Sequence, residues 1–252
     1  MKLLIDLGNT RLKWALWDGA ELHSGGAIAH AGERPLDFDS LWQQVHGADV
    51  AWVASVASPA LDSQLTQSLL ARGIRVTQFV RSRAQACGVR NAYAQPERLG
   101  VDRFLSLIAA HAHAHKPTVI VSCGTALTVD ALSADGTHRG GLIAAAPELM
   151  RSALLGHTAR LGELGSARVV ERADNTDDAV ESGCWLAAAA LIERFVARSA
   201  REEFNTAPAL VLSGGGAQRL AGLVALPSRI DAELVLRGLA MFADHASRAA
   251  NS

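Results

Sequence analysis

Cysteine, net charge and long apolar runs are all scarce in this sequence. Its three cysteines, Cys87, Cys123 and Cys184, form no CxxC pair and no zinc-ligand spacing, so we expect reduced thiols and a cytoplasmic location. No apolar run is long enough to cross a bilayer, and the first residues resemble neither a signal peptide nor a transit peptide. Because 24 basic residues balance 25 acidic ones, we expect neither nucleic acid nor a membrane as partner.

The composition fits a globular protein, with 49% hydrophobic and 19% charged residues in a chain of 252. That length allows one large domain or two small ones. In the first half, the periodicity and turn residues predict an alternation of strands and helices. The expected strands are 1–6, 11–17, 20–28, 51–56 and 75–80, and the expected helices are 37–46, 59–72 and 98–115. This order predicts a mixed sheet with helices on its faces.

The second half begins a similar series after Lys116 and Pro117, which break the preceding helix. We therefore predict two domains, 1–116 and 117–252. The expected strands of the second are 118–122, 126–133, 139–145 and 209–213, and the expected helices begin at Pro147 and cover 174–200 and 231–248. The predicted fold class is α/β, with a mixed sheet flanked by helices in each domain.

Residues 6–13 follow an apolar run and predict a tight turn between two strands. Gly8 lets a backbone approach a ligand closely, and the asparagine, threonine, arginine and lysine that follow offer hydrogen bonds and positive charge. Asp6 is an oxygen ligand of the kind that Mg²⁺ prefers, directly or through water. The bend suits a metal-bound polyphosphate, although a plain hairpin with a polar turn has the same local pattern.

The pattern occurs again near the middle of the chain. Aligning Gly8 with Gly124 places Asn9 on Thr125 and Asp6 on Ser122, between apolar strands in both copies. Such a near-repeat predicts two related domains that could grip a phosphate chain from both sides. The sequence has neither a Walker A loop nor a Rossmann fingerprint.

Two further motifs could bind ligands. The glycines at 214–216 follow a strand and precede a helix, which suits a nucleotide, although a tight strand-to-helix turn also explains them. Residues 99–103 place Asp102 and Arg103 near a helix start. The carboxylate could accept a proton from a hydroxyl and the guanidinium could hold an anion. The alternative is an acid that stabilises the helix dipole.

Other polar clusters have structural explanations. Residues 174–178 form a plausible helix N-cap. His111 and His115 lie one helical turn apart, but no third metal ligand is evident, so we interpret them as a solvated helix end.

Together, the two glycine turns, residues 100–103 and the glycine triplet resemble the type III pantothenate kinases, which include Bvg accessory factor-like proteins. The likeness runs from Asp6 to Leu239. It implies two ribonuclease H-like domains of the actin-like ATPase superfamily, with the active site between them, and a homodimer. It also implies Mg-ATP-dependent phosphorylation of the primary hydroxyl of pantothenate, the first step of coenzyme A biosynthesis. A nucleotide-binding regulatory protein and a related small-molecule kinase are the alternatives.

The resemblance also implies roles for individual residues, with Asp102 as the catalytic base. The ATP-binding set would be Asp6, Leu7, Gly8, Asn9, Thr10, Arg11, Leu12, Lys13, Thr125, Gly214, Gly215 and Gly216. The pantothenate-binding set would be Tyr93, Gly100, Val101, Asp102, Arg103 and, from the neighbouring subunit, Thr176. Asp6 would hold Mg²⁺. Many members of the family have an aspartate at the place of Ser122 that binds potassium or ammonium, so the serine predicts a weak dependence on a monovalent cation.

Overall fold

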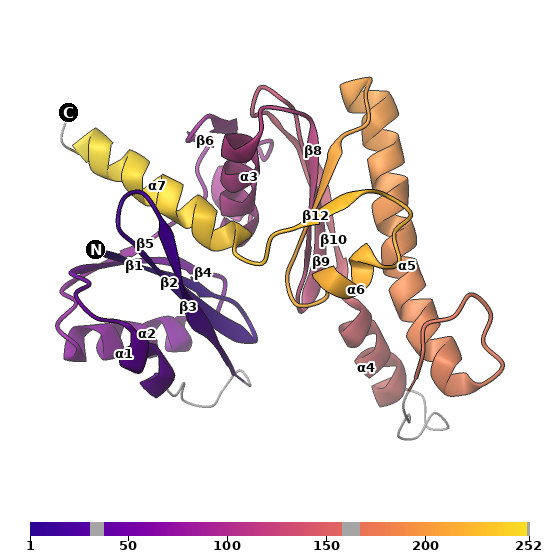
Figure 1. Cartoon of the computed structure of the whole chain (residues 1–252), viewed down its shortest axis with the longest axis horizontal. Coiled ribbons are helices and arrows are strands. Elements are labelled where there is room, and N and C mark those ends of the chain that lie inside the picture. Colours follow the sequence, from indigo (N-terminus) through magenta and orange to yellow (C-terminus); the bar gives the residue numbers. More distant parts are fainter. Residues whose placement is uncertain (31–37, 158–166, 251–252) are drawn as a thin grey trace. The chain divides into compact units, whose positions relative to one another are not determined.

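The computed structural model describes residues 1–30, 38–157 and 167–250. The chain forms two compact units (Figure 1). Unit 1 consists of Met1–Ala114 and Glu233–Ser252, and unit 2 of His115–Ala232. Across the described ranges, no helix combines the length and the apolar character needed to cross a membrane.

Unit 1 is built on a five-stranded mixed sheet with the order β3-β2-β1-β4-β5. The strands are β1 Lys2–Leu7, β2 Arg11–Trp17, β3 Leu22–Ala29, β4 Val50–Ser55 and β5 Val76–Phe79. The central strand β1 runs antiparallel to β2 and parallel to β4. Every strand predicted for the first half is present, with its ends shifted by no more than a few residues.

Helices cover both faces of this sheet because successive side chains of a strand point to opposite sides. The helices of the unit are α1 Asp39–Gln44, α2 Pro59–Ala71, α3 Val101–His113 and α7 Leu234–Ala250. Leu3, Ile5 and Leu7 pack with α1 and α2, while β1 and β4 contact α7 on the other side. Between β5 and α3 lie a short hairpin, β6 Gln85–Ala86 with β7 Val89–Arg90, and a 3₁₀ turn, Pro96–Arg98.

The C-terminal helix α7 differs from the sequence-based assignment. We predicted residues 231–248 as part of the second domain, whereas α7 packs on α3 within unit 1. Its buried side carries Leu236, Leu239 and Ala243. The two helices approach closely at Gly238, where a Cβ atom would overlap the carbonyl group of Leu105. The sequence pattern predicted the helix but not the surface on which it packs.

Unit 2 repeats the sheet of unit 1, with the order β10-β9-β8-β11-β12. The strands are β8 Thr118–Cys123, β9 Ala126–Leu132, β10 His138–Ala145, β11 Ala209–Ser213 and β12 Ser228–Ile230. The central strand β8 is antiparallel to β9 and parallel to β11. The two units therefore share one topology, as the near-repeat predicts. The short edge strand β12 was not predicted.

The α-helices in the described part of unit 2 are α4 Pro147–His157, α5 Thr176–Ser199 and α6 Ala217–Ala221. The long helix α5 covers one face of the sheet, where Trp185 and Ile192 pack with Val119 and Val121. A π-helical turn, Ala200–Phe204, ends α5. The β11 strand leads through the glycine triplet into α6, so the triplet lies at a strand-to-helix turn.

Candidate functional site

Two carboxylates influence each other in unit 1. Asp6 is near the end of β1, directly opposite Lys13 on β2, and Asp102 lies in the first turn of α3. Removal from water and the negative charge of Asp102 raise the pKa of Asp6 from 3.8 to about 7, while Lys13 acts in the opposite direction. Asp6 and Lys13 of the predicted ATP set thus interact electrostatically, and Asp6 also interacts with the predicted base, Asp102.

The first glycine turn joins β1 to β2. The backbone N–H of Gly8 donates to the carbonyl of Arg11 at 2.9 Å, and that of His30 donates to the carbonyl of Thr10 at 2.8 Å. Asn9, Thr10 and Arg11 are exposed, so their polar groups are accessible to a ligand. Leu7 and Leu12, which also belong to the predicted ATP set, are fully buried. Only the backbones of these two leucines could contact a nucleotide.

Gly100 sets the orientation of Asp102 at the start of α3. A Cβ atom on Gly100 would lie 2.6 Å from Asp102 Oδ1, so any other residue would displace the carboxylate. Asp102 Oδ1 also accepts the backbone N–H of Arg103 at 2.8 Å. The neighbouring Val101 is buried, and its side chain is part of the hydrophobic core.

Arg103 is buried, with 5% of its surface exposed, which is rare for arginine without a partner. Its Nη1 donates to the Tyr93 hydroxyl at 3.0 Å, and its guanidinium carbon is 5.8 Å from the centre of the tyrosine ring. Asn91 holds the Tyr93 segment by accepting its backbone N–H at 3.0 Å. The structure thus brings the predicted substrate residues 93 and 100–103 together.

In unit 2, the second glycine turn lies against the glycine triplet. Gly124 donates its N–H to the carbonyl of Ala126 at 3.0 Å, and Gly216 donates to the carbonyl of Cys123 at 3.0 Å. Gly214 has φ +86°, and a Cβ atom there would overlap the backbone of Cys123. Thr125 is exposed at the tip of the turn. The predicted phosphate and adenosine motifs of unit 2 therefore pack against each other through Cys123.

Ser122 is surrounded by hydroxyl-bearing residues on both neighbouring strands. It pairs with Thr128 on β9 and Ser213 on β11, and paired residues point to the same face of a sheet. The buried Asp130, the next residue along β9 on that face, is bonded to His138 at 2.9 Å. Because the Asp130 carboxylate already bonds the His138 imidazole, it is poorly suited to bind a cation in place of an aspartate at position 122.

Thr176 is the first residue of α5 and is exposed. The N-cap predicted for residues 174–178 is Asn175, whose side chain accepts the N–H of Asp178 at 2.9 Å. Asp178 accepts the backbone N–H of Arg168 at 2.8 Å, and this bond, with further bonds to Asn175 and Arg168, lowers the pKa of its carboxyl. Since Asn175 provides the cap, the Thr176 side chain is not needed for it.

The interpretation of His111 as part of a solvated helix end is wrong. His111 is buried and packs on Gly88, where a Cβ atom would lie 3.0 Å from the imidazole Nε2. Within 1–30, 38–157 and 167–250, no three histidine, cysteine, aspartate or glutamate side chains are grouped as a metal site would require. The histidine fills a space between α3 and the β6–β7 hairpin.

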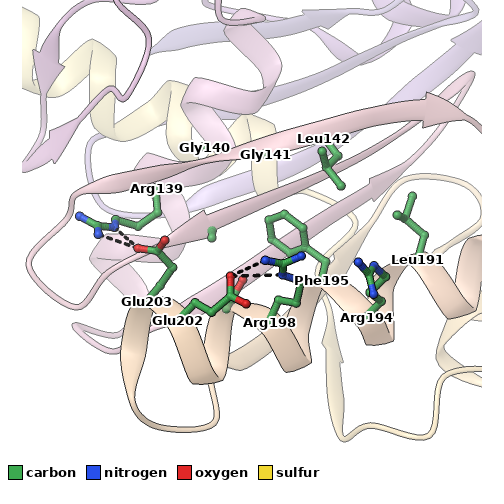
Figure 2. A pocket seen from close by; sticks show the side chains of 12 residues that line it. Arg139, Gly140, Gly141, Leu142, Leu191, Arg194, Phe195, Arg198, Glu202 and Glu203 are labelled. Carbon is green, nitrogen blue, oxygen red and sulfur yellow. Dashed lines mark hydrogen bonds and ion pairs between the residues drawn. The ribbon is translucent and has the colours of Figure 1, made fainter.

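A cavity of about 370 Å³ lies elsewhere in unit 2, between β10 and the end of α5. Figure 2 shows two ion pairs in its lining, Arg139 with Glu203 at 2.6 Å and Arg198 with Glu202 at 2.8 Å. The guanidinium groups of Arg139 and Arg198 are therefore already paired with carboxylates of the same cavity. It contains none of the predicted site residues, and we do not assign the reaction to it.

A family model described as type III pantothenate kinase matches residues 2–198. The chain belongs to the type III pantothenate kinase family. It is 44% identical over 245 residues to the type III pantothenate kinase of Xanthomonas campestris pv. campestris strain 8004, covering 97% of this chain and 98% of that one. It is also 44% identical over 248 residues to that of Stenotrophomonas maltophilia strain K279a, covering 96% and 97%. Family membership makes the chain a kinase, as predicted.

Solved structures agree on the fold. A Baf family protein from Campylobacter jejuni has a TM-score of 0.62 at 19% identity, covering 99% of this chain and 100% of that one. The activator of 2-hydroxyisocaproyl-CoA dehydratase from Clostridium difficile, with bound ADPNP, has a TM-score of 0.53 at 12% identity, covering 99% and 96%. The predicted α/β fold class, with mixed sheets flanked by helices, is confirmed.

Proposed function

We propose that this kinase transfers the γ-phosphoryl group of Mg-ATP to the primary hydroxyl of pantothenate, the first step of coenzyme A biosynthesis. A bond forms between the hydroxyl oxygen and the γ-phosphorus, the bond from that phosphorus to the ADP oxygen breaks, and the hydroxyl proton passes to Asp102. The observation that carries the proposal is that Asp102 lies close enough to Asp6 to raise its pKa, with Lys13 opposite Asp6 on β2, in a chain of this family.

Asp102 would act as the general base. The Arg103 backbone N–H donates to one of its carboxylate oxygens, and this bond fixes the position of the carboxylate. The base is held at the N-terminus of α3, where the helix dipole favours its ionised form. Positioning and charge stabilisation supply most of the rate enhancement in phosphoryl transfer, so a rigidly held base suits this reaction.

Asp6 would hold the magnesium ion, directly or through water. Its carboxyl has a pKa raised to about 7 by removal from water and by the charge of Asp102. A divalent cation would stabilise the ionised forms of both carboxylates, so the donor set fits Mg²⁺. When bound, the ion would neutralise charge on the phosphates. Lys13, opposite Asp6 on β2, would add a second positive charge.

The glycine turns would bind the nucleotide. In unit 1, Gly8 and the exposed side chains of Asn9, Thr10 and Arg11 would donate to phosphate oxygens, with the backbones of Leu7 and Leu12 lining the turn. In unit 2, Thr125 would bind phosphate, and the glycine triplet would lie against the adenosine. Support comes from the close contact of that triplet with Cys123, at the base of the second turn. The triplet consists of Gly214, Gly215 and Gly216.

Pantothenate would bind at Tyr93, Gly100, Val101 and Arg103. The guanidinium of Arg103 would hold a polar or carboxylate end of the substrate, because a buried arginine is a strong anion ligand. Its hydrogen bond to the Tyr93 hydroxyl would hold the two side chains in a fixed relative position during binding.

We also propose a homodimer in which Thr176 reaches the substrate site of the partner. An apolar hollow beside it in unit 2 supports this, lined by residues of α4 and of the first turns of α5, among them Met150, Leu154, Val180 and Cys184. Leu149 and Leu154 of α4 expose 45% of their surface each, and exposed apolar patches mark association sites. We propose the cytoplasm as location, without nucleic acid or membrane as partner, and a weak requirement for potassium or ammonium because of Ser122.

The test of the catalytic assignment is Asp102→Asn. The amide is nearly isosteric but cannot accept the proton, so transfer should fall by ~10²–10⁴-fold while ATP binding measured by calorimetry persists. Asp39→Asn is the matched control, because Asp39 also lies in the first turn of a helix of unit 1. Turnover close to that of the unmodified enzyme at saturating substrates would remove Asp102 from the role of base.

A further inference from the structure

A tryptophan lies directly behind the proposed nucleotide motif. Trp185 of α5 is 3% exposed. A Cβ atom on Gly216 would lie 3.3 Å from the indole Cη2 and 2.5 Å from Cys123 Sγ. The last glycine of the triplet is therefore enclosed between the base of the second phosphate turn and one aromatic ring. A shift of that ring would shift the triplet.

The same ring is held by a charged network that connects three helices. The guanidinium carbon of Arg219, on α6, lies 4.3 Å from the centre of the Trp185 ring. Arg219 Nη1 is 2.6 Å from Glu181 Oε1, and Arg151 Nε, on α4, is 3.6 Å from Glu181 Oε2. Glu181 is 7% exposed. Both oxygens of one buried carboxylate thus bind arginines, and one of these arginines also stacks on the indole.

These contacts compensate for the small size of α6. That helix has five residues, Ala217–Ala221, and so short a helix has little stability of its own. Its position after the triplet must come from tertiary contacts. Arg219 supplies one of them by linking α6 to α5 through Glu181 and Trp185.

A buried carboxylate needs a cation wherever it occurs, so the Glu181–Arg219 pair could serve stability alone. Two features indicate a role beyond stability. Arg219 stands three positions after Gly216, and the side chain on which it stacks is the one that touches Gly216. Stacking on Trp185 and ion pairing with Glu181 together fix the plane of the Arg219 guanidinium. Neutralising the charge of Glu181 would not require a fixed plane.

We propose that Glu181, Trp185 and Arg219 are positioning residues for nucleotide binding. They hold the glycine triplet against the second phosphate turn at the distance that a nucleotide needs. This inference rests on the proposed function, because the nucleotide site is part of it. Nothing in the sequence pattern links Glu181 to Trp185 or to Arg219, so this network was not predicted.

Calorimetric titration of the full-length protein with Mg-ADP tests the proposal. Arg219→Gln should raise the Kd for Mg-ADP about 10-fold, the loss expected for one charge-assisted contact, and Arg219→Lys should recover part of it. The KM for pantothenate should stay within about twofold, since those residues lie in unit 1. Arg198→Gln, which removes an exposed ion pair with Glu202 further along α5, is the matched control and should leave both constants unchanged.

The fluorescence emission of Trp185 is a second measurement. If Trp185 had only a structural role, binding of Mg-ADP would not change this emission. The other four of the five tryptophans precede residue 53, so Trp185 is the single tryptophan of unit 2. Mg-ADP should change the emission of the unmodified protein, and the change should be absent in Trp185→Phe.

Three results would overturn the inference. They are an unchanged Mg-ADP Kd in Arg219→Gln, an equal loss of pantothenate affinity, and an emission change that survives in Trp185→Phe. If the unmodified protein phosphorylates pantothenate and Arg219→Gln binds Mg-ADP normally, only the positioning role fails. If the unmodified protein binds no Mg-ADP, the proposed function fails with it.

Discussion

Replacing Asp6 with asparagine should stabilise the ligand-free protein while reducing its activity. Removal from water and the charge of Asp102 raise the pKa of Asp6 from 3.8 to about 7. Between these two pH values the folded carboxyl keeps a proton that the unfolded chain has released. Its contribution to stability therefore falls as the pH rises from about 4 to 7, and is lowest above 7. An asparagine cannot ionise, so Asp6→Asn removes this cost.

The size of the effect follows from the shift in pKa. A shift of this size corresponds to ~4 kcal/mol if it is expressed in full, and partial exposure of Asp6 reduces it to ~2 kcal/mol through solvent screening. For a chain of this length, each kcal/mol moves the melting temperature by about 2–4 °C. We therefore expect Asp6→Asn to melt about 4–8 °C higher than the unmodified protein at pH 8, and the gain to be smaller at pH 5.

Thermal unfolding followed by circular dichroism at pH 5, 6, 7 and 8 measures this directly. Asp18→Asn is a control of opposite sign. The Asp18 carboxylate accepts the N–H groups of Glu21 and Ala20 at 2.8 Å each and bonds His23 at 2.7 Å. These bonds lower the pKa of Asp18, so Asp18→Asn should melt lower at pH 8. An Asp6→Asn variant that melts lower at pH 8, or gains equally at pH 5 and pH 8, would refute the reasoning.

Three further predictions concern the nucleotide, the cation and the dimer. Gly214→Ala should raise the KM for ATP about 10-fold, because a strained backbone costs roughly 1–3 kcal/mol and φ at Gly214 is +86°; an unchanged KM would contradict this. Initial rates in sodium, potassium and ammonium salts at constant ionic strength should be similar, and Ser122→Asp should increase potassium dependence; strong saturable activation of the unmodified enzyme would count against the argument. Mixing Thr176→Ala with Asp102→Asn chains should restore activity, because heterodimers contain one intact site; no gain after confirmed subunit exchange would exclude a composite site.

The local order of elements was predictable because it depends on neighbouring residues. The offset that aligns Gly8 with Gly124 also aligns β1 with β8, end to end. The two central strands then pair with their neighbours in the same directions. A repeated apolar strand and glycine turn was thus sufficient to predict the repeated fold.

Long-range contacts were not predictable from the pattern. The apolar face of α7 indicates burial, but its packing on α3 depends on the close approach at Gly238. The electrostatic interaction of Asp6 with Asp102 joins residues far apart in the sequence. Buried Arg103 reverses the usual expectation that arginine is exposed. Each case depends on which surfaces meet, and no single segment of the sequence contains that information.

The most direct test of the central claim is a phosphoryl-transfer assay with the unmodified protein. Mg-ATP is supplied with and without pantothenate, ADP release is followed, and the products are examined by phosphorus NMR and mass spectrometry. We expect ADP release to require pantothenate, with one phosphoryl group added to its primary hydroxyl for each ADP formed. ADP release at the same rate without pantothenate, or no phosphorylated pantothenate among the products, would contradict the account.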